Sequence, residues 1–180
     1  ILQPDAEKIR RFWPAPRLLR LALEKILRGE DFLQQKMGKE YRPVFMTFTT
    51  GTTHTPVSFL YSMQDINNLY LSGARMLKLF DIKESERIVN VFPFAPHLAF
   101  WQVVFGGLSS GFLVLSTGGG KVMTTDGNIN AILKMKPAVI LGVPSYVYHL
   151  LRAAQEKGCR MEFVKKVVLG AAAVSEPYNE

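Results

Sequence analysis

Cysteine is almost absent from this sequence, since Cys159 is the only one in 180 residues. A single cysteine forms no internal disulfide and supplies no cysteine-based zinc site. Disulfide frameworks belong to oxidising compartments, whereas a lone cysteine is typical of a reducing one. The sequence therefore favours a cytoplasmic protein, and Cys159 has no evident base partner that would make it a covalent nucleophile.

An unbroken apolar run long enough to cross a bilayer is also lacking. Residues 88–120 contain no Asp, Glu, Lys or Arg, and a membrane helix needs about 20 mostly apolar residues in one run. Two glycines at 106–107 and a Ser-Ser-Gly segment at 109–111 interrupt this stretch. We therefore expect a buried helix, a turn and a buried strand here, and no membrane span.

Acidic residues are fewer than basic ones, with 15 Asp and Glu against 22 Lys and Arg, which gives a formal net charge of +7. This balance favours anionic partners such as nucleotide phosphates, nucleic acid or anionic lipid. The basic residues are dispersed over helical segments and form no dense block with interleaved aromatics. We therefore favour a solvated basic surface over a nucleic-acid groove.

Helical spacing alternates with short β-branched runs along the chain, which predicts an α/β fold with a sheet flanked by helices. Residues 1–42 are interpreted as a basic amphipathic helical segment and residues 43–180 as a first α/β subdomain. Expected strands cover 44–50, 57–61, 87–92, 112–115, 138–141 and 164–169, and expected helices begin at Ser62, Leu98, Asp126 and Pro144. Asp65 predicts a capping box with Ser62, and Gly158 is expected to end the last of these helices.

The segment from Thr49 to Pro56, between the first two expected strands, is the richest in chemistry. Its hydroxyls and backbone N–H groups surround one glycine and can converge on an anion, and glycine permits close approach of the ligand. A threonine-rich hairpin turn is the alternative interpretation. Residues 118–121 do not form a Walker A loop, because Leu115 and Val122 stand where that motif needs Gly and Ser or Thr.

The order of residues in this segment resembles the phosphate loop of the adenylate-forming, or AMP-binding, superfamily. The continuation over residues 57–66 resembles the phenylacetate-CoA ligase-like members. By this resemblance, the nucleotide phosphates would be bound by Thr49, Thr50, Gly51, Thr52 and Thr53. Two departures are His54, where the family has a second glycine, and the absence of the lysine that commonly stands beside the residue corresponding to Pro56.

A second segment, Asn90 to Trp101, is rich in aromatic residues and proline. On composition alone, this segment is explained by packing in the hydrophobic core, with its one histidine satisfied by hydrogen bonds. It also resembles the family's Pro-x-x-His stretch, which lines the acyl pocket and helps to place the carboxylate. The resemblance, together with that of residues 136–145, implies an acyl pocket containing Phe94, His97, Trp101 and Gly142.

A third segment, residues 167–173, resembles the small-residue stretch followed by glutamate that packs on the adenine in this family. It implies that Gly170, Ala171 and Ala172 contact the adenine. Tight packing at a strand end is an equal alternative. The glutamate position is filled by Ala172 or Ala173, depending on the register of the match.

The resemblance as a whole implies the amino-terminal part of a longer AMP-forming carboxylate:CoA ligase that uses ATP, Mg²⁺ and CoA. The magnesium ligands and the catalytic lysine are expected beyond Glu180, and no metal ligand is assigned within this chain. A non-catalytic nucleotide- or acyl-binding module and, less favoured, a basic nucleic-acid-binding domain remain alternatives. The sequence leaves the carboxylic acid, the final acceptor and a homodimer open.

Overall fold

The computed structural model describes residues 13–48, 57–94 and 97–172. The chain divides into two compact units. The helical unit comprises residues 1–46 and 60–66, and the sheet unit comprises residues 47–59 and 67–180. Within the described part of the chain, no helix combines the length and the apolar composition that crossing a membrane requires.

In the helical unit, helices α2 (Ala15–Arg28) and α3 (Glu30–Glu40) are joined at Gly29, whose φ is 86°. The two helices face each other through charged side chains, since Arg17 pairs with Glu40 and Lys36 pairs with Glu24. The opposite side of α2 is apolar and exposed. Its more than half-exposed residues are Leu19, Leu23, Ile26 and Leu27.

Strands β1 (Phe45–Phe48) and β2 (Ser58–Tyr61) pair in a two-stranded sheet. The rings of Phe45 and Tyr61 lie 5.7 Å apart between their centroids. Both expected strands are confirmed where the structure describes them, whereas residues 49–56 lie outside the described part of the chain.

Helix α4 (Met63–Leu79) begins with the expected capping box. The Ser62 backbone N–H donates to Asp65 Oδ2 at 2.8 Å, and the Asp65 N–H donates to Ser62 Oγ at 3.3 Å. This reciprocal pair satisfies backbone donors that the first helical turn leaves without a partner.

The sheet unit holds a four-stranded sheet in the order β4-β3-β5-β6. All its neighbouring strands are parallel, with Val89 opposite both Leu115 and Ile140. The strands span Ile88–Asn90 (β3), Val114–Ser116 (β4), Val139–Gly142 (β5) and Lys166–Leu169 (β6). The α/β class is therefore confirmed, and each of these strands falls on an expected segment.

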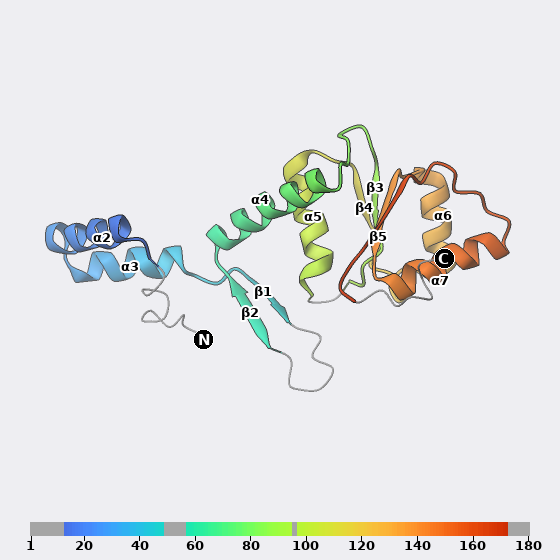
Figure 1. The fold of residues 1–180 in the computed structure, drawn as a ribbon. Coiled ribbons are helices and arrows are strands. Elements are labelled where there is room, and N and C mark those ends of the chain that lie inside the picture. The colour runs from blue at the N-terminus through green and yellow to red at the C-terminus, as the bar shows by residue number, and fades with distance from the viewer. Residues whose placement is uncertain (1–12, 49–56, 95–96, 173–180) are drawn as a thin grey trace. The chain divides into compact units, whose positions relative to one another are not determined.

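Helices cover both faces of this sheet (Figure 1). Alternate strand residues point to opposite faces, so that Val139 and Leu141 enter one core while Ile140 enters the other. The first core includes residues of α4 and α5 (Leu98–Ser110), and the second includes residues of α6 (Thr125–Met135) and α7 (Pro144–Glu156).

The strand order reverses direction between β3 and β5. The chain passes from β3 to its neighbour β4 on one side, and then returns across β3 to β5 on the other. In open α/β sheets, ligands bind outside the carboxyl ends of the strands at such a reversal. The buried Asn90 fixes this end of β3, because its amide nitrogen donates to Phe100 O and Ser116 Oγ at 3.1 Å and its Oδ1 accepts the Phe92 N–H at 3.1 Å.

One expected helix start is wrong. Thr124, and not Asp126, is the N-cap of α6, and Thr124 Oγ1 accepts the Gly127 N–H at 3.1 Å. Asp126 lies inside the first turn, where its charge still favours the positive end of the helix dipole. The expected end of α7 at Gly158 is confirmed, since that glycine has a φ of 68° and its N–H donates to Gln155 O.

Helices α4 and α5 cross where each carries a glycine. A β-carbon on Gly73 would lie 2.5 Å from the Gly106 Cα, and one on Gly106 would lie 3.0 Å from the Gly73 carbonyl. Hydrogen bonds flank the crossing, since the Gln102 amide donates to Ser72 Oγ at 2.9 Å and Ser109 Oγ donates to Tyr70 O at 3.0 Å. The two backbones are thus held in direct contact.

Candidate functional site

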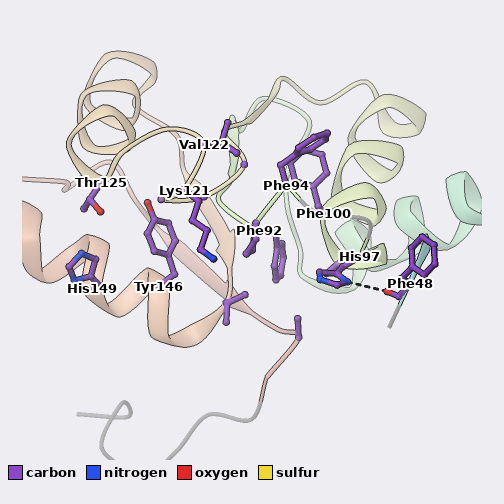
Figure 2. Close-up of a pocket in the computed structure, with 17 residues that line it drawn as sticks. Phe48, Phe92, Phe94, His97, Phe100, Lys121, Val122, Thr125, Tyr146 and His149 are labelled. Atoms are coloured by element: carbon purple, nitrogen blue, oxygen red, sulfur yellow. Dashed lines mark hydrogen bonds between the residues drawn. The ribbon is translucent and has the colours of Figure 1, made fainter. Parts of the chain in front are cut away.

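A cavity of about 1100 Å³ lies at the carboxyl ends of the parallel strands (Figure 2). Segments that follow all four strands contribute to its wall. These are Pro93 and Phe94 after β3, residues 118–121 after β4, Val143 after β5 and Ala171 after β6. The cavity therefore occupies the position where this sheet topology places a ligand.

One side of the cavity is aromatic, lined by Phe48, Phe92, Phe94 and Phe100. Phe94 packs edge-on against Phe100 with 5.2 Å between ring centroids. Its backbone N–H donates to Gly118 O at 3.0 Å, which holds the segment after β3 against the segment after β4. The Phe94 side chain is nevertheless 58% exposed, and this apolar surface is available to a ligand.

His97 lines the same side of the cavity and directly precedes α5. Its Nδ1 lies 3.1 Å from the carbonyl oxygen of Phe48 (Figure 2). Because a carbonyl only accepts, Nδ1 carries the proton in this contact and Nε2 is left for another partner. Nε2 accepts a hydrogen bond when the ring is neutral and donates one when it is protonated.

The other side of the cavity is polar, with Lys121, Thr125, Tyr146 and His149 in its wall. The Tyr146 ring packs against Gly120, where an added β-carbon would lie 2.6 Å from a ring carbon. The Tyr146 hydroxyl is buried and makes no hydrogen bond of acceptable geometry. Burial raises the pKa of this phenol above its ordinary value, and the nearby Thr125 hydroxyl offsets part of the rise.

The structure brings two of the residues expected in an acyl pocket, Phe94 and His97, to the cavity wall. Trp101 and Gly142 are not among the described lining residues. Trp101 lies behind the wall, with its ring centroid 6.0 Å from that of Phe94. Gly142 fills a tight space in the core, where an added β-carbon would lie 2.5 Å from a methyl of Val91.

The residues expected at an adenine follow β6. The Gly170 N–H donates to Gly142 O at 3.2 Å, Ala171 lines the cavity with a φ of 64°, and Ala172 is exposed. The expected phosphate-binding residues, Thr49 to Thr53, lie outside the described residues.

Several lining residues were missed by sequence reasoning, namely Lys121, Thr125, Tyr146, His149, Phe48 and Phe92. A usable signal existed for Lys121, because it closely follows an expected strand and strand ends in α/β sheets carry binding residues. Tyr146 and His149 are three residues apart in a helix and so share one of its faces.

Metal-binding side chains do not gather in the described part of the chain. No group of three or more His, Cys, Asp or Glu residues is close enough together there to hold an ion. No step is therefore assigned to a metal held by these residues.

Residues 5–180 match the family model of the AMP-binding enzymes. Solved structures with the same fold include a 2-hydroxyisobutyryl-CoA ligase in complex with 2-HIB-AMP and CoA, which has a TM-score of 0.65 and 22% identity over 71% of this chain and 27% of the ligase chain. An o-succinylbenzoate CoA synthetase from Bacillus subtilis in complex with AMP has a TM-score of 0.59 and 19% identity over 77% of this chain and 27% of that chain.

A long-chain-fatty-acid-CoA ligase from Archaeoglobus fulgidus has a TM-score of 0.58 and 18% identity over 74% of this chain and 26% of that chain. The chain thus spans about a quarter of the length of the solved structures that it matches. Its helices and parallel sheet match the N-terminal domain of adenylate-forming enzymes. No curated protein sequence matches the chain.

Proposed function

We propose, because the chain belongs to the AMP-binding enzyme family, that the full-length protein activates a carboxylic acid with ATP and transfers the acyl group to CoA. A carboxylate oxygen attacks the α-phosphorus of ATP, and the bond from that phosphorus to pyrophosphate breaks. The sulfur of CoA then takes the acyl group from the acyl-adenylate and releases AMP. The resemblance of residues 49–66 favours a phenylacetate-CoA ligase-like member.

The observation that carries this proposal is the cavity at the carboxyl ends of the parallel strands, with one apolar aromatic side. Phe94 would contact the apolar part of the acid, and the protonated His97 ring would donate from Nε2 to its carboxylate. In this proposal, Trp101 and Gly142 shape the pocket from behind, since Trp101 supports Phe94 and Gly142 allows β5 to lie close to Val91. The protein contributes mainly by positioning the reactants and stabilising charge.

The nucleotide would contact the segments that follow β1 and β6. We assign the phosphates to Thr49, Thr50, Gly51, Thr52 and Thr53. The adenine would pack on Gly170, Ala171 and Ala172, which follow β6. Mg²⁺ would neutralise phosphate charge, with ligands from outside the described residues. We place the reaction in the cytoplasm, in keeping with the lone Cys159.

A non-catalytic nucleotide- or acyl-binding module is the second candidate. It is favoured by His54, by the missing lysine beside Pro56 and by alanine at the expected glutamate position. Both candidates predict binding of ATP or an acid, and they differ in chemical turnover.

Acid-dependent ATP–pyrophosphate exchange by the full-length protein separates the two candidates. Exchange with phenylacetate or a fatty acid supports the ligase. Binding of ATP and acid without exchange supports the binding module.

The phosphate loop is tested by the double variant Thr52→Val, Thr53→Val, which removes two hydroxyls and keeps the shape of the side chains. Hydrogen bonds to charged groups contribute about 1.5–3 kcal/mol each, so we expect ATP affinity to fall about tenfold or more. Ser58→Val on β2, outside the loop, is the control and should leave ATP affinity unchanged. Unchanged affinity in the double variant would remove the phosphate-loop assignment.

A further inference from the structure

The wall of the cavity carries positive charge without a compensating acid. Lys121 is the only Lys or Arg among the described lining residues, and none of these residues is Asp or Glu. His97 and His149 add two imidazoles, and neither side chain carries negative charge. The site as described therefore favours an anion over a neutral or cationic molecule.

Lys121 makes no hydrogen bond or ion pair with another described residue. Some other lysines of the sheet unit form ion pairs, as Lys165 does with Glu86 and Lys157 with Asp126, whereas Lys134, like Lys121, has no partner among the described residues. Figure 2 shows the Lys121 side chain extending from its loop into the cavity. Its ammonium group is thus available to a ligand without breaking a contact within the described residues.

The backbone of the loop that carries Lys121 is held firmly, which fixes the point from which the side chain leaves the loop. Gly118 and Gly119 have φ values of 76° and 75°, a conformation that glycine adopts without strain. The fully buried Asn128 donates to Gly119 O at 3.4 Å and to Thr124 O at 3.1 Å. The Tyr146 ring packs on Gly120 from below the loop.

His97 and Lys121 lie on opposite sides of the cavity, and Phe92 lies between them in the view of Figure 2. If His97 binds the carboxylate that is activated, an acid with one anionic group places its apolar part against the phenylalanines of the cavity wall. Such an acid leaves Lys121 without a partner. An acid with a second anionic group at its far end pairs with Lys121 and keeps its apolar part against the phenylalanines. A charge-assisted hydrogen bond of this kind changes affinity by about tenfold or more.

We propose that Lys121 selects for acids with a second anionic group, in the simplest case dicarboxylic acids with an apolar middle. The proposal rests on the proposed function for its assignment of the reacting carboxylate to His97. The alternative role for an unpaired lysine at this edge is a contact with a phosphate of ATP or CoA. The two roles differ in which substrate responds when Lys121 is replaced.

The test uses the full-length protein and pairs of acids that differ only by the second carboxylate. The pairs are hexanoate with adipate, and phenylacetate with 4-carboxyphenylacetate. Initial rates of pyrophosphate release give kcat/KM for each acid, and KM is measured for ATP and CoA with the better acid. The variants are Lys121→Gln, Lys121→Arg and the control Lys134→Gln, which removes an exposed lysine on α6 outside the cavity wall.

We expect kcat/KM of the native protein to be about tenfold or more higher for at least one diacid than for its monoacid partner. Lys121→Gln should abolish this preference by lowering kcat/KM for the diacid alone, Lys121→Arg should keep it in part, and Lys134→Gln should leave it unchanged. KM for ATP and for CoA should not respond to any of the three variants.

Two results would overturn the proposal. The first is a higher kcat/KM of the native protein for the monoacids than for the diacids. The second is a rise in KM for ATP or CoA in the Lys121→Gln variant while its preference between the acids stays that of the native protein. If no acid supports pyrophosphate release, the proposed function fails, and calorimetric titration with adipate and hexanoate decides the inference separately. Tighter adipate binding that Lys121→Gln abolishes would support the anion site. Equal binding of the two acids would reject it.

Discussion

Replacing Gly73 with alanine should destabilise the sheet unit, although alanine is the better helix former. A β-carbon at Gly73 would lie 2.5 Å from Cα and 2.7 Å from the backbone nitrogen of Gly106. These are backbone atoms, so no side-chain rotation relieves the clash and α4 and α5 must move apart. Their separation would also strain the hydrogen bond from the Gln102 amide to Ser72.

The change in the free energy of unfolding caused by Gly73→Ala is the sum of two opposing effects. Overpacking a close contact costs about 1–3 kcal/mol, and the rigid backbone at this crossing places Gly73→Ala at the upper end of that range. Helix propensity returns about 1 kcal/mol when alanine replaces glycine inside a helix. The net loss in the free energy of unfolding is therefore about 2 kcal/mol. Gly106→Ala should lose less, because its β-carbon would lie 3.0 Å from the nearest atom.

Urea unfolding of the full-length protein, followed by circular dichroism, measures the change. The matched control is Gly38→Ala in α3, where a β-carbon would meet no atom within 4 Å. This control should gain about 0.5–1 kcal/mol from helix propensity alone. A Gly73→Ala variant that is as stable as the native protein, or as stabilised as Gly38→Ala, would refute the close crossing of α4 and α5.

Two further predictions concern a helix cap and a buried carboxylate. Thr124→Ala removes the oxygen that accepts the Gly127 N–H at 3.1 Å. It should lower the free energy of unfolding, measured with urea, by about 1 kcal/mol. The control Asn130→Ala, at an exposed position of α6, should lower it less, and equal losses in the two variants would reject the cap. The Lys83 backbone N–H, at 3.0 Å, holds the pKa of Glu86 below its ordinary value of 4.5. The contact between the Lys83 N–H and the ionised Glu86 carboxylate therefore stabilises the fold above pH 4.5, and this stabilisation is lost as the pH falls through the lowered pKa of Glu86. The difference in unfolding midpoint between the native protein and Glu86→Gln should shrink from pH 6 to pH 3, and a difference that stays constant would contradict the assigned contact.

Local patterns were sufficient for most of the secondary structure. The strand at 139–142 was predictable because its apolar run is bounded by prolines, and the start of α4 because Ser62 and Asp65 stand at capping-box spacing. The cap of α6 was missed because Thr124 and Asp126 are both good capping residues. The backbone geometry at Thr124, with φ −47° and ψ 162°, decides between them.

The candidate site was predictable only in part. Phe94 and His97 stand in a recognisable segment, and the structure brings both to the cavity. The sequence grouped Trp101 with them, but its ring lies behind Phe94 and outside the described lining. Lys121 and His149 carry no motif, and they become neighbours of the same cavity only through the packing of β4 and α7 around β3 and β5.

The sequence by itself determined the α/β class, the segments that form helices and strands, and the resemblance to adenylate-forming enzymes. These depend on residue spacing and on interactions between residues close along the chain. The tertiary structure alone decided the strand order, the contact between Gly73 and Gly106, and the presence of an unpaired lysine in the cavity wall. Such features depend on which distant segments pack together. Residue spacing within a single segment does not determine which other segment it will contact.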